Sequence, residues 1–245
     1  MLKVLGRGAH GTVWLLADSE RPAVSPAGNA AVLPEDRAPA STTPAVPESP
    51  PSLPPRGAFS SQIRFDTALC VWRAVKISPP TRFTAHEQRT LAQLHHAFIV
   101  PFLGASSDAC KNYLVLEAGL GGDLATLLTE QDALLTDAQA RLLVGCLASA
   151  IGYIHSTGIM FRDLKPENVI VGEDGFVRLI DFGLAKSTSE RSFTLCGTLE
   201  YCAPELIQLQ GHGREVDWWA LGIITYELLH GYTPFSGEGT IEEVT

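Results

Sequence analysis

The first half of the chain contains short runs in which apolar and polar residues alternate, and this pattern predicts β-strands. Residues 2–5 and 12–16 are two such runs on either side of a glycine-rich turn, and together they predict a hairpin. Further strands are predicted at residues 70–77, 99–102 and 113–116.

A short helix is predicted from about Thr84 to Leu94, and its start has two interpretations. If Thr84 is the N-cap, Glu87 completes a capping box and is tied to the helix start. If the cap is Thr81, Glu87 is free to pair with a cation elsewhere. The sequence is compatible with both.

A longer helix is predicted after Thr136, which has the capping-box spacing with Gln139, and it ends near residues 156–158. The chain then passes through a polar segment. Two short apolar runs, residues 169–171 and 177–180, predict strands beyond it.

Residues 20–57 interrupt this pattern, because they are rich in proline, alanine and serine and almost free of aromatic residues. Such a segment cannot bury enough apolar surface to offset the entropy of ordering, so we expect disorder. Residues 50–54 contain a P-x-x-P spacing that suits an SH3-type partner, although a passive insertion is the simpler interpretation.

Composition narrows the class of protein. The chain of 245 residues is 45% hydrophobic and 18% charged, which is enough for a buried core. Its longest apolar run, residues 142–154, is too short to cross a bilayer. The net charge of −9 argues against nucleic acid as the main partner and suits a basic substrate, although most carboxylates are expected to be solvated surface.

Five cysteines at wide spacings predict neither a zinc site nor a disulfide framework. Cys196 lies in a polar loop, where a small buried residue is a simpler interpretation than a reactive thiol. Residues 1–5 lead straight into glycines, without the anatomy of a signal peptide. We therefore expect reduced thiols and a cytosolic or nuclear protein.

The polar segment Phe161–Asn168 carries an acid, a cation and an amide at fixed spacing. Asp163 would accept or orient a hydroxyl proton, Lys165 would screen moving negative charge, and the amide oxygen of Asn168 would hold a metal. This set suits transfer of a phosphate to a hydroxyl beside Mg2+. A charged turn explains any single residue, but not all eight in this order.

Three other features point to phosphate chemistry. The glycine turn lets backbone amides approach a phosphate, and a strand after it disfavours the dinucleotide-binding alternative, which requires a helix. Lys76 ends an apolar strand, and Glu87 is its candidate ion-pair partner. Asp181, before Phe182 and Gly183, is a candidate metal ligand, with an Asx turn as the plain alternative.

These motifs occur in the order of the protein-kinase signature set, which ends here with Ala203-Pro204-Glu205. The chain therefore resembles a eukaryotic protein kinase of the serine/threonine type. Residues 194–198 and 217–222 resemble the AGC group, the relatives of protein kinases A, B and C and S6 kinase. The implied fold is bilobal α+β, with a small antiparallel sheet plus one helix and a larger, mainly helical lobe.

The resemblance also implies domain boundaries. The kinase domain would occupy residues 1–245, with the smaller lobe at 1–116, a hinge at 117–123 and the larger lobe at 124–245. Because the last helices and the C-terminal tail of the AGC group are not found before Thr245, we expect an incomplete larger lobe.

The family implies ATP and Mg2+ as cofactors and a role for each matched residue. Asp163 would be the catalytic base, Lys165 would contact the γ-phosphate, and Asn168 and Asp181 would hold Mg2+. The residues expected around the nucleotide are Gly6, Gly8 and Gly11 over the phosphates, Lys76 with Glu87, Val13, Ala74 and Ile170 around the adenine, Leu116 as gatekeeper, the backbone of Glu117 and Gly119, and Asp123.

Regulation and substrate choice are implied in the same way. Thr194 matches an activation-loop site for an upstream kinase, and its phosphate would pair with Arg162. Thr198 would hydrogen-bond Asp163 and Lys165, which favours protein substrates with Ser or Thr. The resemblance implies arginine-rich substrates, which would contact three acidic residues: Asp123, Glu167 and Glu227. It also implies a regulatory spine that is anchored by Asp217 and formed by Leu91, Phe102, Phe161 and Phe182.

The expected truncation and the proline-rich insertion keep a second interpretation open, and three further positions depart from the family pattern. Phe161 replaces the usual His or Tyr, Leu199 replaces a usual Pro, and the interval from Lys76 to Glu87 is short for the group. The alternative to an active kinase is a weakly active or inactive kinase-like scaffold that binds nucleotide or partner proteins.

Overall fold

The computed structural model describes residues 2–8, 11–18, 71–130, 134–188 and 191–235. The predicted disordered insertion at 20–57 and its P-x-x-P spacing lie outside the described residues. Within the described ranges, no helix combines the length and the apolar character needed to cross a membrane.

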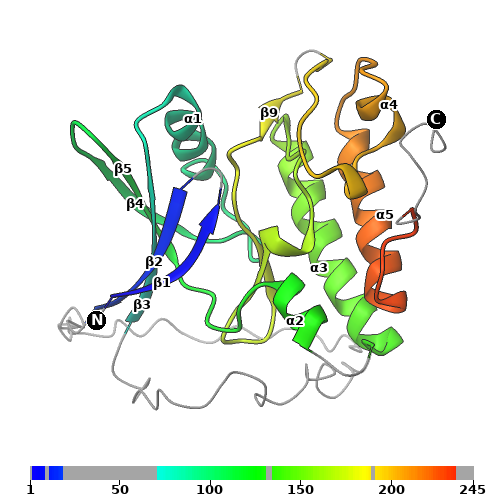
Figure 1. Cartoon of the computed structure of the whole chain (residues 1–245), viewed down its shortest axis with the longest axis horizontal. Coiled ribbons are helices and arrows are strands. Elements are labelled where there is room, and N and C mark those ends of the chain that lie inside the picture. Colours follow the sequence, from blue (N-terminus) through cyan, green and yellow to red (C-terminus); the bar gives the residue numbers. More distant parts are fainter. Residues whose placement is uncertain (1, 9–10, 19–70, 131–133, 189–190, 236–245) are drawn as a thin grey trace, which may run out of the picture.

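A five-stranded antiparallel sheet forms one side of the molecule, in the order β1-β2-β3-β5-β4 (Figure 1). Its strands are β1 (Leu2–Gly8), β2 (Gly11–Asp18), β3 (Val71–Ser78), β4 (Phe102–Ser107) and β5 (Asn112–Glu117). Lys76 pairs with Val13 on one side and Leu114 on the other, so it lies on the central strand of the sheet.

Helix α1 (Arg82–Leu91) settles the question of the cap. Thr81 is the N-cap, and its capping box is formed with Thr84. Glu87 is therefore free of the helix start. The helix begins two residues before the predicted Thr84 and ends at Leu91 instead of Leu94, which is nevertheless buried in the core.

The strand predicted at residues 99–102 is wrong, because β4 begins at Phe102 and runs to Ser107. Ile99 instead forms a parallel bridge with Leu179, and the neighbouring Val100 N–H donates to the carbonyl of Leu179 over 3.0 Å. The apolar run therefore marks a buried join between the sheet and the other half of the molecule. β4 itself is mostly exposed, which is why its sequence carries no alternating apolar signal.

The other half of the molecule is mainly helical, and α3 and α5 pack side by side in it (Figure 1). Its helices are α2 (Leu124–Glu130), α3 (Asp137–Ser156), α4 (Pro204–Ile207) and α5 (Glu215–His230), with 3-10 turns η1 (Pro166–Asn168) and η2 (Leu199–Tyr201). Two small antiparallel sheets pair β6 (Ile159–Met160) with β9 (Lys186–Ser187) and β7 (Val169–Val171) with β8 (Val177–Leu179).

The long helix was predicted correctly: Thr136 caps α3 and forms the expected capping box with Gln139. The sequence did not reveal α2, which is only seven residues long. One apolar core contains buried residues of β3 and β5 together with those of α3 and α5. This arrangement confirms the predicted bilobal α+β fold.

Candidate active site

The carboxylate of Asp217 holds the start of the segment Phe161–Asn168. It accepts the backbone N–H groups of Phe161 at 2.8 Å and Arg162 at 2.7 Å, and it lies 2.7 Å from Nε2 of His155. Asp217 is only 1% exposed, and Arg162 has a φ of 68°, which non-glycine residues seldom adopt. The buried carboxylate therefore stabilises an unusual backbone conformation immediately before Asp163.

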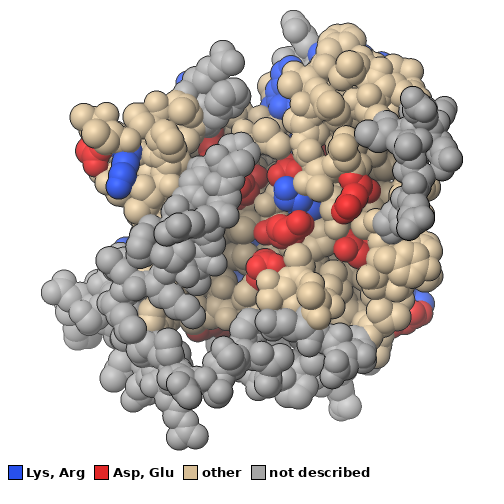
Figure 2. Space-filling model, viewed as in Figure 1, with Lys and Arg blue, Asp and Glu red and all other residues tan. Residues whose placement is uncertain are grey.

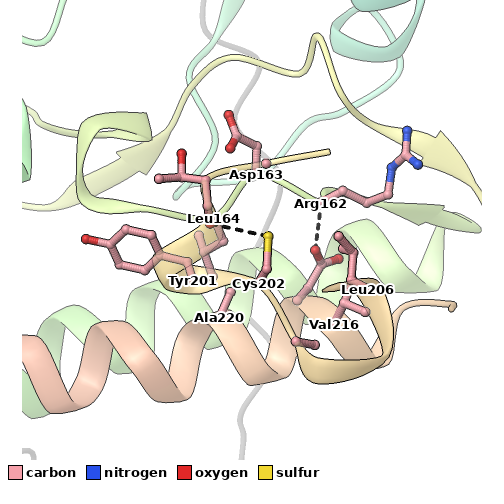
Figure 3. Close-up of a pocket in the computed structure, with 12 residues that line it drawn as sticks. Arg162, Asp163, Leu164, Tyr201, Cys202, Leu206, Val216 and Ala220 are labelled. Atoms are coloured by element: carbon pink, nitrogen blue, oxygen red, sulfur yellow. Dashed lines mark hydrogen bonds between the residues drawn. The ribbon is translucent and has the colours of Figure 1, made fainter. Parts of the chain in front are cut away.

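The three predicted polar residues of this segment converge. The Asn168 amide donates to the Asp163 carbonyl at 2.7 Å and to Oδ2 of the same residue at 2.8 Å. Nζ of Lys165 lies 3.3 Å from Oδ2 of Asp163 and donates to Oγ1 of Thr198 at 2.9 Å. Figure 3 shows that the side chains of Asp163 and Arg162 point in different directions from adjacent positions.

The predicted ion pair between Lys76 and Glu87 is present, with 2.7 Å between Nζ and Oε1. Nζ of Lys76 also lies 2.9 Å from Oδ1 of Asp181, which joins β3, α1 and the segment after β8. Burial by itself would lower the pKa of Lys76, but the carboxylates of Asp181 and Glu87 raise it above its ordinary value. Lys76 is therefore a cation throughout the physiological pH range.

Apolar contacts support these polar groups from behind. Phe161 and Phe182 are completely buried and meet edge to face, with ring centroids 5.0 Å apart. Leu91 is buried in the same core, and Phe102 is partly buried against it. The phenyl ring of Phe161, at the position where the resemblance implies His or Tyr, is thus accommodated by an apolar environment.

The predicted nucleotide-facing residues lie along the sheet and the connection from β5 to α2. Ala74 pairs with Leu116 across β3 and β5, and both side chains are buried. A Cβ on Gly119 would lie 2.6 Å from Cδ1 of Ile170, so this position has room only for glycine. Gly6 and Gly8 are in β1, Gly11 starts β2, Val13 is partly buried, and Glu117 ends β5; residues 9–10 of the turn lie outside the described residues.

Asp123 has a local structural role that the sequence analysis missed. Its two carboxylate oxygens accept the N–H of Thr126 at 2.8 Å and the Thr126 hydroxyl at 3.0 Å. Asp123 is therefore the N-terminal cap of α2, and an Asp just before an apolar run is the signal that predicts such a cap.

Acidic side chains surround a small basic area on the face shown in Figure 2. Tyr201 donates its hydroxyl to Oε2 of Glu227 over 2.9 Å. Burial raises the pKa of Glu227, and the nearby charges of Glu167 and Glu200 raise it further. Glu167, Glu200 and Glu227 thus form an acidic cluster beside Tyr201, and the sequence analysis had not selected Glu200 or Tyr201.

The structure does not bring Thr194 to Arg162. Nη1 of Arg162 instead donates to Oγ of Ser192 over 3.0 Å, and Nζ of Lys186 donates to the same oxygen over 3.1 Å. Ser192 is buried, whereas Thr194 is exposed two residues further along. Two cations thus converge on a hydroxyl near the predicted phosphorylation site, and sequence reasoning had found only one of them.

The donor set suits Mg2+ that is bound together with phosphate. Among the described residues, no group of three or more His, Cys, Asp and Glu side chains has the arrangement of a metal site. The Asn168 amide nitrogen is used by Asp163, which leaves the Asn168 side-chain oxygen as the acceptor. One carboxylate and one amide oxygen match the sparse protein ligation typical of Mg2+ with substrate phosphates.

The arrangement agrees with what comparison with known proteins finds. Residues 71–245 match the family model described as "Protein kinase domain". The chain belongs to the protein kinase family. This match includes every site residue described above from Ala74 onward, whereas β1 and β2 precede it.

Similar proteins support the predicted AGC group. The chain is 43% identical over 154 residues to the cAMP-dependent protein kinase catalytic subunit of Dictyostelium discoideum, covering 63% of this chain and 24% of that protein. It is 44% identical over 153 residues to cGMP-dependent protein kinase 2 of Rattus norvegicus, covering 62% of this chain and 20% of that protein. For ribosomal protein S6 kinase 2 alpha of Xenopus laevis, the identity is 39% over 165 residues, covering 66% of this chain and 22% of that protein.

The matched part spans less than half the length of these curated relatives, with 42% covered in a Caenorhabditis briggsae protein. The comparisons therefore establish the family and the serine/threonine kinase type of this domain. The activity, substrates and partners of the whole protein are matters for proposal.

Replacing Asp217 with Ala would leave two backbone N–H groups and His155 without their acceptor. Because each unsatisfied buried group costs about 1–3 kcal/mol, we expect the free energy of unfolding to fall by at least about 2 kcal/mol. Urea unfolding measures this change. Asp137→Ala is the control, since Asp137 is exposed and pairs only loosely with Arg141 at 3.4 Å; equal losses in the two variants would contradict the anchoring role.

Proposed function

We propose that the chain is an ATP-dependent protein serine/threonine kinase that transfers the γ-phosphoryl group of Mg-ATP to Ser or Thr hydroxyls of protein substrates. The observation that carries the proposal is the preassembled polar network of Asp163, Lys165, Asn168 and Thr198. Lys76, paired with Glu87 and Asp181, supplies a second fixed charge. Phosphoryl transfer depends mainly on positioning and electrostatics, and both are present here.

Asp163 is proposed to orient the substrate hydroxyl and accept its proton. The Asn168 amide fixes the orientation of this carboxylate, because it bonds to both the side chain and the backbone of Asp163. Lys165 lies beside the same carboxylate and is positioned to stabilise negative charge on the transferred group. Thr198 holds Lys165 in place.

Asp181 and the side-chain oxygen of Asn168 are the residues proposed to hold Mg2+. When bound, the ion would neutralise charge on the nucleotide phosphates. Lys76 would bind phosphate oxygens, and its two carboxylate partners keep it protonated. Val13, Ala74 and Ile170, with Leu116 and the backbone of Glu117 and Gly119, are proposed to enclose the adenine, and the glycines of β1 and β2 to cover the phosphates.

The acidic cluster supports a preference for basic sequences around the target hydroxyl. Glu227 is partly buried beside Glu167 and Glu200, so a cation bound there would offset the repulsion among the three carboxylates. An arginine guanidinium is the side chain best suited to such carboxylates. Asp123 is proposed to contribute to this surface or to the nucleotide through lone pairs that the α2 cap does not use.

Phosphorylation of Thr194 by an upstream kinase is proposed to order the segment from Asp181 to Glu205. Arg162 and Lys186 already point to Oγ of Ser192, two residues from Thr194. A phosphate on Thr194 would give these cations a stronger partner than a neutral hydroxyl. We also propose a cytosolic or nuclear location, in keeping with the free thiols of the four described cysteines.

Asp163→Asn removes the proposed proton acceptor while preserving the shape of the side chain. We expect phosphotransfer to an arginine-rich Ser/Thr peptide to fall by about 10²–10⁴-fold, the usual contribution of general base catalysis, with ATP binding retained. Radiolabel transfer and nucleotide titration measure the two quantities. Asp174→Asn, at an exposed residue that pairs with Arg178, is the control.

Two outcomes would contradict an active kinase. Tight ATP binding without turnover in the wild type would favour the alternative of a kinase-like scaffold. Phosphotransfer that survives Asp163→Asn would indicate a contaminating enzyme.

Thr194→Ala removes the proposed phosphorylation site. After treatment with an upstream kinase, we expect the wild type to gain about tenfold or more in activity, because one charge-assisted hydrogen bond contributes about 1.5–3 kcal/mol. The Ala variant should show no gain. Equal activity of the treated wild type and the treated variant would rule out control through Thr194.

Glu227→Gln tests the basic-substrate preference and keeps an acceptor for Tyr201. Because the folded-state pKa of Glu227 is raised, ionisation costs the folded state stability above pH 4.5, so the variant should be at least as stable as the wild type at pH 7. KM for an arginine-containing peptide should rise about 5–30-fold, equivalent to about 1–2 kcal/mol. A matched peptide with Ala for Arg is the control; an equal change for both peptides would refute the preference.

A further inference from the structure

Two cysteines, Cys196 and Cys202, lie close together in the segment that leads to the Ala203–Glu205 motif. Both are free thiols and both are only partly buried. The thiol of Cys202 donates to the carbonyl of Cys196, with 3.6 Å between Sγ and O, and to the carbonyl of Thr198, with 3.3 Å. The Cys202 thiol therefore lies against the backbone of Cys196, although six positions separate the two residues.

Gly197 makes this close return of the chain possible. Its φ is +89°, and a Cβ there would lie 2.9 Å from the carbonyl oxygen of Arg162 and 3.7 Å from Sγ of Cys202. The turn therefore packs closely against the catalytic segment, with no space for a side chain at position 197. The two cysteines are kept together by the fold.

The packing around Cys202 is incomplete. A cavity of about 10 Å³ adjoins it and is lined by Cys202, Leu164, Ala220 and neighbouring residues. That is about the space that one water-sized group occupies. Burial is the main reason that the pKa of the Cys202 thiol is raised to about 11, and the nearby charge of Cys196 raises it further.

We propose that Cys196 and Cys202 form an intramolecular disulfide when the protein meets a peroxide oxidant. One thiolate sulfur attacks an oxygen of the peroxide and the O–O bond breaks. The cysteine becomes a sulfenic acid, and the other peroxide oxygen takes up a proton and leaves as water or an alcohol. The second thiolate then attacks the sulfenic sulfur, the S–S bond forms, and the oxygen leaves as water. Two thiols are oxidised, one peroxide is reduced, and atoms and electrons balance.

The disulfide would act on phosphotransfer through Thr198, a consequence that rests on the proposed function. Thr198 lies inside the ring of residues 196–202 that the bond would close, and its hydroxyl holds Lys165 at 2.9 Å. Bond formation also ends the hydrogen bonds from the Cys202 thiol to the carbonyls of Cys196 and Thr198. We expect the oxidised form to transfer phosphate more slowly.

The chemistry of the pair predicts slow formation and slow reversal. Burial raises the pKa of both thiols, so few thiolates exist at pH 7, and the oxidation rate should increase as the pH rises toward 9. Thiols with a high pKa are also poor leaving groups, so the disulfide should exchange slowly with an external thiol. The pair would respond to sustained oxidation.

Peptide mapping of the full chain provides the direct test. The protein is treated with hydrogen peroxide, free thiols are alkylated, and the digest with trypsin is analysed by mass spectrometry. Cleavage after Arg191 and Arg214 releases both cysteines on one peptide that contains no other cysteine. We expect this peptide to lack two hydrogens and to carry no alkyl group, and dithiothreitol should restore both thiols.

Matched variants separate this pair from other thiol chemistry. Cys196→Ser and Cys202→Ser should each abolish the internal disulfide, and thermal unfolding confirms that they fold, whereas Cys110→Ser, at an exposed cysteine, should leave it intact. A sulfenic or higher acid on Cys196 with Cys202 still alkylated would overturn the proposal. A bond from either residue to another cysteine or another molecule would do so as well.

Phosphotransfer is measured on the same samples. Loss of activity that dithiothreitol reverses, and that Cys202→Ser prevents, supports the regulatory consequence; an unchanged rate in the disulfide form overturns it. Absence of phosphotransfer in the fully reduced wild type would instead count against the proposed function, because the disulfide is detected without any assay of activity.

Discussion

The geometry of the site depends first on a buried carboxylate that satisfies backbone donors. Asp217 accepts the N–H groups of Phe161 and Arg162 and contacts His155, and it is provided by α5, which packs against α3 in the larger lobe. The left-handed conformation of Arg162 would be costly without such compensation. Because the next residue is Asp163, the packing of α5 against α3 sets where the proposed proton acceptor lies.

A second constraint is the balance of charge across the junction of the two lobes. Lys76 from β3 is bonded to Glu87 of α1 and to Asp181 beyond β8, so one cation links three parts of the chain. Lys165 plays a similar part between Asp163 and Thr198. Elsewhere the balance is incomplete, since Glu167, Glu200 and Glu227 lie together. This concentration of negative charge supports the proposed preference for basic sequences around the target hydroxyl.

Local signals predicted much of the fold, and their failures have physical causes. The cap of α3 was correct because Thr136 and Gln139 interact within one turn of helix. The cap of α1 remained ambiguous because Thr81 and Thr84 are both good caps; in the structure Thr81 is the cap, Thr84 completes its capping box, and Glu87 pairs with Lys76. The strand predicted around Ile99 was wrong because burial against Leu179, and not pairing within the sheet, explains its apolar residues.

By itself, the sequence determined the family, the class of reaction and the identity of the polar residues, because the order and spacing of short motifs are visible in the sequence without knowledge of tertiary contacts. Tertiary structure decided which partner each residue takes. The Arg162 guanidinium donates to the hydroxyl of Ser192 and not to that of Thr194. Asp123 caps a helix, and the Cys202 thiol contacts the backbone carbonyl of Cys196. These choices depend on how segments far apart in the chain pack, whereas propensity and periodicity report only on near neighbours.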